Sequence, residues 1–311
     1  MFSSKIRSRS GRHIYRLNKI RKFTVIFILI FAVGITTLIV SGFQNRVKNN
    51  KRELLRIWNA GNYEQAYEIS KNALNEKPVD YFLLTTNGFS AYQWGISQIN
   101  NHNTLTYIND CIRSLRKAIL LRISSKDARV FYVLGKAYSY KGPEYSDLAV
   151  KYLEMADNLN YSAQDIPEYL GLAYAAAGDY RNSVSAFTKA FNKGSVSDNL
   201  LMSIARSYMG MGEYDMAVSY LKRCTELSPD SKSVFAARLL LAEVYIHSGD
   251  HSGAQAQYLS ILDEYGENAE VRYQLGELFN LIGDTTRARA EWRIAYRQDP
   301  AHTKARARLN I

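Results

Sequence analysis

The stretch YLGLAYAAAGDYRNSVSAFTKAF, residues 169–191, decides the fold because it contains two short amphipathic patterns of helical period joined at Gly178-Asp179. A helix commonly ends in a left-handed backbone conformation, which glycine adopts without steric cost. The stretch therefore predicts a helix, a tight turn and a second helix. Because one pair of short helices buries little apolar surface, we expect each pair to pack against further pairs.

The same turn recurs along the chain. Its glycines follow one another at spacings of 34, 47, 36, 34, 37 and 34 residues, and they are Gly61, Gly95, Gly142, Gly178, Gly212, Gly249 and Gly283. A period of 34 is typical of a repeated pair of helices. The second helices carry small residues where close packing is expected, namely Ala66, Cys111, Ala149, Ser183, Ala217, Ala254 and Ala288. Pro78, Pro229 and Pro300 each follow their glycine by 17 residues, where proline prevents the second helix from continuing.

Leu-Gly pairs with an aromatic residue three positions later, such as Leu170-Gly171 with Tyr174, complete a pattern that resembles the tetratricopeptide repeat (TPR) family. The resemblance implies an all-α fold, a right-handed superhelical solenoid of about seven helix-turn-helix units over residues 44–302. The expected units are 47–80, 81–127, 128–163, 164–197, 198–234, 235–268 and 269–302. The second unit contains an insertion, Gln98–Tyr107, which we interpret as a surface loop in preference to a partner-specific contact.

Residues 303–311 suffice for a short C-terminal capping helix. Such a cap is expected to leave the apolar face around Trp292 and Tyr296 partly exposed. An exposed apolar face favours association. The sequence therefore predicts a homo-oligomer through the C-terminal cap, or a partner bound there.

The net charge of +11 is concentrated at the N-terminus. Residues 1–22 contain eight Lys or Arg and no acidic residue, and the rest of the chain carries 32 basic against 29 acidic residues. This distribution favours a membrane-orienting segment over a nucleic-acid-binding surface. Residues 23–43 follow as 21 residues without charge, and at about 1.5 Å per residue they span about 31 Å, the thickness of a bilayer core.

We therefore expect residues 1–22 to be a basic cytoplasmic N-terminus and residues 23–43 to be a transmembrane signal anchor. A cleaved signal peptide is the competing interpretation, but its apolar region is usually shorter, about 7–15 residues. Four basic residues just after the span, Arg46, Lys48, Lys51 and Arg52, are fewer than the eight before it. The charge bias predicts that the repeats lie on the side of the membrane opposite the cytoplasm. The similar layout of membrane-tethered repeat proteins of bacteria implies that this side is the periplasm at a bacterial inner membrane.

No phosphate-binding loop, nucleophile motif or paired-cysteine metal site is present in the sequence, and we expect neither an enzyme nor a cofactor. HSGDH, residues 247–251, is a weak metal candidate because Gly249 separates its two histidines. The aspartate of this motif is expected to cap a helix or form a turn. Cys111 and Cys224 lie about three repeats apart, so we expect small packing positions and no disulfide.

In the TPR family the first helices of the units line a groove that binds peptides. The resemblance implies partner-binding residues at the matching positions, which are Arg129, Tyr132, Lys136, Glu168, Tyr169, Asn199, Met202, Arg206, Leu239, Glu243, Tyr273 and Glu277. Leu172, Met209 and His247 share this register. The positions change from basic in the third unit to acidic in the sixth and seventh, which predicts a ligand with charge polarity and disfavours a site that clamps a C-terminal carboxylate.

The functional prediction is a membrane-anchored scaffold that binds a protein or peptide partner in envelope assembly, secretion or protein quality control. Two alternatives remain open at this point. One is an organelle docking receptor with its repeats in the cytosol, and the other is a regulatory subunit of a membrane enzyme. Both share the expected anchor and helical repeats with the scaffold, which is the favoured interpretation.

Overall fold

The computed structural model describes residues 51–311, apart from 122–126, 193 and 195–196. The predicted cytoplasmic N-terminus and transmembrane helix lie outside these residues. Within the described part, no helix combines the length and the apolar character needed to cross a bilayer. The described residues divide after Pro78 into two compact units, 51–78 and 79–311.

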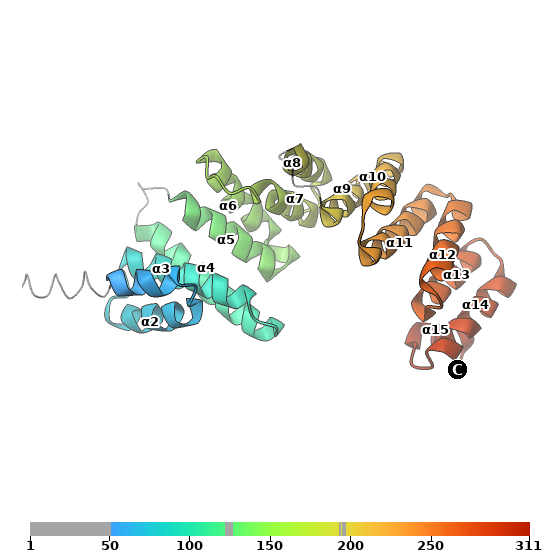
Figure 1. The fold of residues 1–311 in the computed structure, drawn as a ribbon, viewed down its shortest axis with the longest axis horizontal. Coiled ribbons are helices and arrows are strands. Elements are labelled where there is room, and N and C mark those ends of the chain that lie inside the picture. Colours follow the sequence, from blue (N-terminus) through green and yellow to red (C-terminus); the bar gives the residue numbers. More distant parts are fainter. Residues whose placement is uncertain (1–50, 122–126, 193, 195–196) are drawn as a thin grey trace, which may run out of the picture. The chain divides into compact units, whose positions relative to one another are not determined.

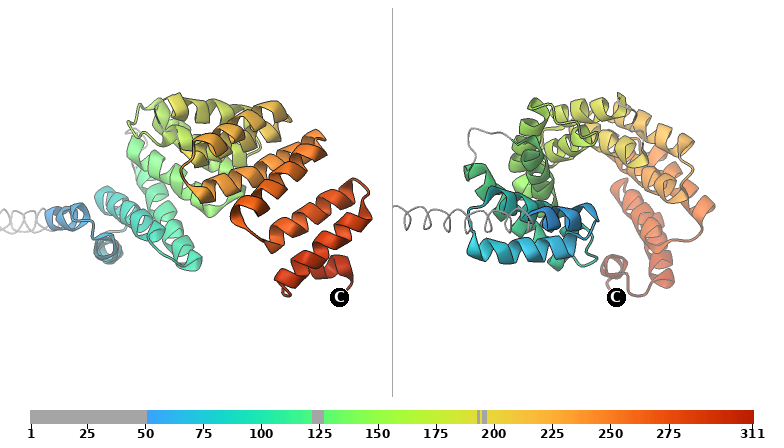
Figure 2. Two further views of the ribbon diagram at one scale, coloured as in Figure 1. Left: turned by 45° about the vertical axis from the view of Figure 1, so that its right-hand side comes forward. Right: turned by 60° about the vertical axis from the view of Figure 1, so that its left-hand side comes forward.

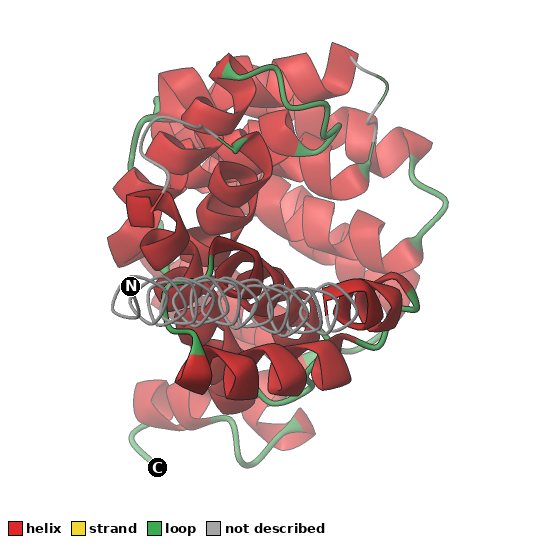
Figure 3. Ribbon diagram, turned by 90° about the vertical axis from the view of Figure 1, so that its left-hand side faces the viewer, coloured by secondary structure: helices red, strands yellow, loops and turns green. Residues whose placement is uncertain are grey.

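The described residues form helices and no strands, which confirms the all-α prediction (Figure 3). In the first unit, residues 51–59 are helical and α2 (Tyr63–Glu76) follows. The helices of the second unit are α3 (Tyr81–Ile96), α4 (Asn101–Leu121), α5 (Ala128–Lys141), the 3-10 helix η1 (Pro143–Tyr145), α6 (Ser146–Asn158), α7 (Ile166–Ala176), α8 (Tyr180–Asn192), α9 (Asp198–Gly210), α10 (Tyr214–Leu227), α11 (Ser231–Ser248), α12 (His251–Tyr265), α13 (Ala269–Leu281), α14 (Thr285–Gln298) and α15 (Thr303–Leu309).

Each helix of the second unit packs on the next one along the chain (Figures 1 and 2). The first helices of successive pairs also contact one another, in the order α3, α5, α7, α9 and α11. These five helices therefore form a row, and their side chains meet along one side of the second unit. That row carries the predicted partner-binding positions of the third to sixth units.

Six of the seven turn glycines have the positive φ that the turn prediction requires, and the exception is Gly95. Gly178 has a φ of 77° and Gly249 a φ of 83°, and no atom lies within 4 Å of where their Cβ would be. Asp250 follows Gly249 and caps α12 by accepting a hydrogen bond from the Gly253 amide at 2.9 Å. This bond confirms the capping interpretation of the HSGDH aspartate.

Small residues allow the paired helices to approach closely. Ser183 in α8 is fully buried, and its hydroxyl donates to the carbonyl of Gly171 in α7 at 2.8 Å. A Cβ added to Gly171 would lie only 2.4 Å from Phe187 Cδ1. The predicted small positions of the second helices are all fully buried, namely Ala66, Cys111, Ala149, Ser183, Ala217, Ala254 and Ala288.

The structure corrects two interpretations of the second repeat. Most of the Gln98–Tyr107 insertion is helical, because α4 begins at Asn101 and runs for 21 residues. The Asn100 side chain accepts from the His102 amide at 2.8 Å at this start. Gly95 lies inside α3 instead of at a turn, and its missing Cβ would be 2.9 Å from Tyr107 Cβ. The extra turns of α4 thus pack against Gly95, so the insertion lengthens a helix and is not a surface loop.

The structure also corrects the prediction of a partly exposed apolar face at the C-terminal end, but only for Trp292. Trp292 is only 5% exposed and belongs to the core around α13 and α14. The short helix α15 packs on α14, with Ala305 fully buried and the Arg308 guanidinium 5.4 Å from the centre of the Trp292 ring. α15 therefore covers the face around Trp292, whereas Tyr296 is half-buried, and the homo-oligomer through the C-terminal cap stays a prediction.

Both cysteines are buried free thiols. Cys111 lies in α4 and Cys224 in α10, each at a position where a small side chain fits between helices. Burial raises the pKa of both thiols, that of Cys224 to about 11. Little thiolate is therefore present at neutral pH, and both side chains act as packing residues.

Candidate functional site

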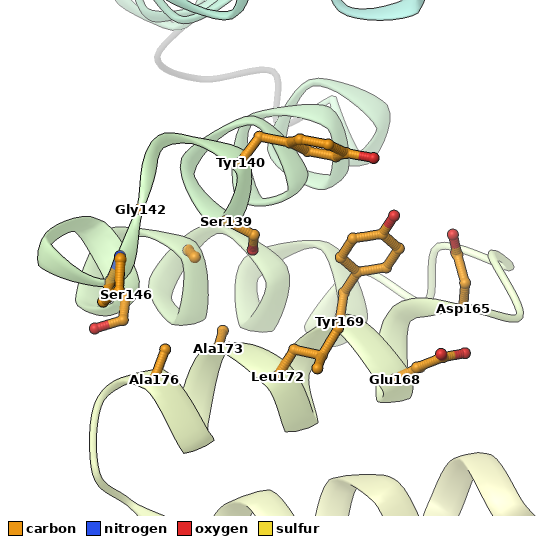
Figure 4. Close-up of a pocket in the computed structure, with 12 residues that line it drawn as sticks. Ser139, Tyr140, Gly142, Ser146, Asp165, Glu168, Tyr169, Leu172, Ala173 and Ala176 are labelled. Carbon is orange, nitrogen blue, oxygen red and sulfur yellow. The ribbon is translucent and has the colours of Figure 1, made fainter. Parts of the chain in front are cut away.

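Two adjoining pockets open on the row of first helices. The α5–α7 pocket has a volume of about 660 Å³ (Figure 4), and its walls are formed by Ser139, Tyr140, Gly142, Pro143, Ser146, Ala149, Asp165, Glu168, Tyr169, Leu172, Ala173 and Ala176. The α7–α9 pocket has a volume of about 560 Å³ and is lined by Leu172, Ala175, Tyr180, Phe187, Ser203, Arg206, Ser207, Met209, Gly210, Tyr214 and His247. Leu172 lines both, so the pockets form one surface, here called the first-helix groove.

A lysine network fixes the wall of the α5–α7 pocket. Lys136 Nζ pairs with Asp165 Oδ2 at 2.8 Å and donates to the Tyr132 hydroxyl at 3.0 Å. The Tyr132 hydroxyl in turn donates to the Asp165 carboxylate at 2.8 Å. The ammonium also lies 4.3 Å from the centre of the Tyr169 ring and 5.8 Å from that of Tyr92. These contacts join α3, α5 and α7 across three successive repeats.

The network also determines the charge state of its members. Burial opposes the charged form of Lys136, whose side chain is 13% exposed, but the hydrogen bonds to Asp165 and Tyr132 outweigh it and raise its pKa. Burial raises the pKa of Tyr132 to about 12. Lys136 is therefore charged and Tyr132 neutral at any physiological pH, and both are bound to Asp165. Neither residue offers a free polar group to a partner, although both were predicted as partner-binding residues.

The open part of the α5–α7 pocket is aromatic and acidic. Tyr140 of α5 and Tyr169 of α7 lie near one another, and Leu172 and Glu168 flank Tyr169 along α7 (Figure 4). Among the residues that the structure describes, none forms an ion pair or hydrogen bond with the Glu168 carboxylate. Since Lys136 balances Asp165, Glu168 leaves one uncompensated negative charge on this wall.

The α7–α9 pocket has the opposite charge. Arg206 is exposed, and no described residue forms an ion pair with its guanidinium. His247 stacks on Tyr214 in the wall of this pocket, with ring centres 6.3 Å apart. The lining contains no Asp or Glu at all, so Arg206 is a free cation beside apolar and aromatic walls.

The structure removes other predicted residues from the available surface. Met202 is 7% exposed and packs in the core with Leu201 and Leu241. Leu239 is partly buried against the core of the next repeats. Arg129 is exposed but forms an ion pair with Asp127 at 3.4 Å.

The cap helix occupies the predicted positions of the seventh unit. Tyr273 is 9% exposed, with the His302 ring centre 5.1 Å from its own. Glu277 accepts hydrogen bonds from Arg308, of which the one from Nε measures 2.9 Å. Tyr273 and Glu277 therefore contact the cap, and the acidic charge predicted for the seventh unit is neutralised within the chain.

Of the predicted residues, Glu168, Tyr169 and Arg206 come together in the groove, whereas Asn199 and Glu243 are exposed but line neither pocket. Sequence reasoning missed Tyr140 as a pocket residue. Tyr132, Lys136 and Tyr140 follow at four-residue spacing and so share a face of α5, which was an available signal. Tyr180 opens α8, and no sequence feature marked it.

Metal-binding side chains do not converge in the part of the chain that the structure describes. No group of three or more His, Cys, Asp or Glu there has the arrangement needed to hold a metal ion. In HSGDH, His247 stacks on Tyr214 and Asp250 caps α12, so these two side chains have structural partners.

Comparison with known proteins agrees with the repeat pattern. Residues 208–278 match the family model described as a tetratricopeptide repeat. Tetratricopeptide repeat protein 8 of Caenorhabditis elegans is 23% identical over 228 residues, which cover 72% of this chain but only 43% of that protein. The chain thus spans less than half the length of this relative.

Two solved structures have a similar fold. The C-terminal part of a TPR repeat-containing protein from Cytophaga hutchinsonii has a TM-score of 0.60 and 16% identity, over 84% of this chain and all of that one. A tetratricopeptide repeat protein from Parabacteroides merdae has a TM-score of 0.53 and 17% identity, over 84% of this chain and 98% of that one. Together with the family match, these similarities support the TPR family and a solenoid of TPR type.

Proposed function

We propose that the chain is a membrane-anchored scaffold whose first-helix groove binds a segment of a partner protein. TPR proteins generally mediate protein–protein interactions, and the groove gives this general role a location. The observation that carries the proposal is the pair of adjoining pockets with uncompensated charges, Glu168 in one and Arg206 in the other. Aromatic walls supply contact area and unpaired charges fix the register of a bound chain.

The anchor is residues 23–43, which are uncharged and long enough to span a bilayer. The basic residues 1–22 favour a cytoplasmic N-terminus and repeats in the periplasm, where the scaffold would serve envelope assembly, secretion or protein quality control. A reporter enzyme active only in the periplasm, fused after Ile311, tests this orientation. Activity of a cytoplasm-specific reporter at the same position would contradict it.

Binding in the groove is tested by crosslinking the full-length protein in its own membrane and identifying the bound proteins by mass spectrometry. The test variant combines Glu168→Lys with Arg206→Glu, which reverses both pocket charges and leaves the net charge unchanged. The matched control combines Lys222→Glu with Glu226→Lys on α10. Both control residues are exposed, and neither lines a pocket.

We expect partners that are recovered with the wild type and the α10 control and lost with the groove variant. Far-UV circular dichroism of the variants establishes that their helices are intact. Recovery of the same partners with all three proteins would contradict binding in this groove and direct attention to the outer helices.

A further inference from the structure

The two pockets differ in the charge that they can accept, and this difference specifies the bound segment. We infer that the groove binds an extended segment in which a lysine or arginine enters the α5–α7 pocket and an acidic residue, three or four positions away, reaches Arg206. An apolar side chain between them packs on Leu172. The inference rests on the proposed function and adds the chemistry of the partner.

The case for a cationic group in the α5–α7 pocket rests on Glu168 and the tyrosines beside it. The lining contains two carboxylates and no Lys or Arg, and only Asp165 has a basic partner in the described structure. Tyr169 already accepts one ammonium group, that of Lys136, at 4.3 Å from its ring centre. Tyrosine rings and a free carboxylate together favour a cation, because the ring face and the carboxylate are both negative.

The case for an anionic group in the α7–α9 pocket rests on Arg206. The guanidinium presents several donors in a planar fork that suits a carboxylate. No acidic side chain lines this pocket, so the chain itself offers Arg206 no carboxylate there. A partner carboxylate would supply the missing charge, and the rings of Tyr180 and Tyr214 would pack against the rest of its side chain.

The separation of the two charges follows from the repeat. The spacing of 34 between Gly178 and Gly212 places Met202 level with Glu168, so Arg206 lies one turn further along α9. One turn is about 5.4 Å along the axis and neighbouring axes lie about 8–10 Å apart, so the two positions are separated by about 11 Å. An extended chain covers this distance in about three residues, at about 3.3–3.6 Å each.

The exposure of Leu172 is the reason to expect an apolar side chain between the two charged residues of the bound segment. Leu172 is 44% exposed, although it is a large aliphatic side chain at the centre of the surface shared by both pockets. By the same repeat spacing it lies level with Arg206 on the neighbouring helix. A side chain that covers Leu172 therefore bridges the two charged contacts.

The test is selection from a displayed library of random peptides on the full-length protein in lipid nanodiscs. Five proteins are compared: the wild type, Glu168→Lys, Arg206→Glu, Leu172→Arg, and the α10 control with Lys222→Glu and Glu226→Lys. The wild type and the α10 control should enrich peptides with a basic and an acidic residue three or four positions apart. Glu168→Lys should lose the preference for the basic residue, and Arg206→Glu the preference for the acidic one.

A synthetic peptide from the wild-type selection then gives the affinity by fluorescence anisotropy. Replacing its basic residue with norleucine should weaken binding to the wild type about tenfold, the effect of losing one charge-assisted contact. The same replacement should not weaken binding to Glu168→Lys, and it should strengthen it because it removes the repulsion between two like charges.

The outcomes separate the two proposals. If the wild type enriches peptides without the charge pair, or if Glu168→Lys selects the same charges as the wild type, the inferred chemistry is wrong while peptide binding in the groove stands. If the wild type enriches only the peptides that the Leu172→Arg variant also enriches, the proposed function of the groove is wrong as well.

Discussion

Replacing Lys136 with methionine tests whether the contact between the third and fourth repeats depends on a charged network. Methionine keeps much of the length of the side chain but removes the ammonium that binds Asp165 at 2.8 Å. Breaking a buried ion pair costs about 3–5 kcal/mol, and an exposed pair is worth at most about 1 kcal/mol. The Lys136 side chain is 13% exposed and that of Asp165 is 37% exposed, so solvent screens the acidic partner in part.

We therefore expect a coupling energy of about 1–2 kcal/mol between the two residues, between those limits. Loss of the contact between the ammonium and the Tyr169 ring adds about 0.5–1 kcal/mol to the effect of Lys136→Met alone. A double-mutant cycle with Asp165→Asn separates the pair energy from these other losses. The assay is urea unfolding followed by far-UV circular dichroism, with hydrogen exchange to show that α5 and α7 lose protection first.

Arg129→Met is the matched control because Arg129 also lies in α5 and pairs with an aspartate. Its side chain is 63% exposed and the distance to Asp127 is 3.4 Å, so the loss should stay below about 1 kcal/mol. A coupling energy near zero for Lys136 and Asp165, or a loss no larger than that of Arg129→Met, would refute the reasoning.

Three further predictions follow from the same structure. The pKa of Lys136 is raised in the folded state above the usual lysine value of about 10.4. The contribution of its charge to the unfolding free energy is therefore full below about pH 10.4 and is lost as the pH rises above that value. The difference in unfolding free energy between wild type and Lys136→Met should be constant from pH 7 to 9 and narrow above about pH 10.4 in a urea series. Gly171→Ala should destabilise the protein by about 1–3 kcal/mol in thermal unfolding, because the new Cβ would lie 2.4 Å from Phe187. The energetic cost of this overpacking exceeds the gain from the higher helix propensity of alanine. Deleting residues 303–311 should expose Trp292, now 5% exposed, and shift tryptophan fluorescence to longer wavelength; an unchanged spectrum would contradict the covering role of α15.

The repeating backbone could be predicted from the sequence because its signals are local. A glycine such as Gly178 adopts a positive φ wherever a helix reverses, whatever lies around it. Gly95 shows the limit of this reasoning, since it occupies a similar place in the spacing but serves close packing of α3 against α4. Turn and packing glycines look identical in sequence, and only the position of Tyr107 above Gly95 distinguishes them.

Lengths of helices beyond the repeat were harder to predict. The polar composition around Asn100 favours a loop, but an asparagine at such a position can also cap the first turn of a helix, as Asn100 does for α4. The residues after Asn100 place Tyr107, Ile108 and Cys111 on one face of α4. Ile108 and Cys111 are fully buried and the Tyr107 ring contacts Trp94 of α3, and this packing stabilises the added turns. Tertiary packing therefore determined that this segment is helical, although its local composition favoured a turn.

The charges of the groove show why register alone does not identify a binding site. Lys136 and Glu277 hold first-helix positions that suggested a basic end and an acidic end. Lys136 binds Asp165 from the next repeat and Glu277 binds Arg308 from the cap, partners that lie 29 and 31 residues away in the chain. A charge becomes available to a partner only where the neighbouring repeat offers no counter-charge, as at Glu168 and Arg206. Within the groove the free charges therefore run from negative at Glu168 in the fourth repeat to positive at Arg206 in the fifth, an order that the first-helix positions alone did not indicate.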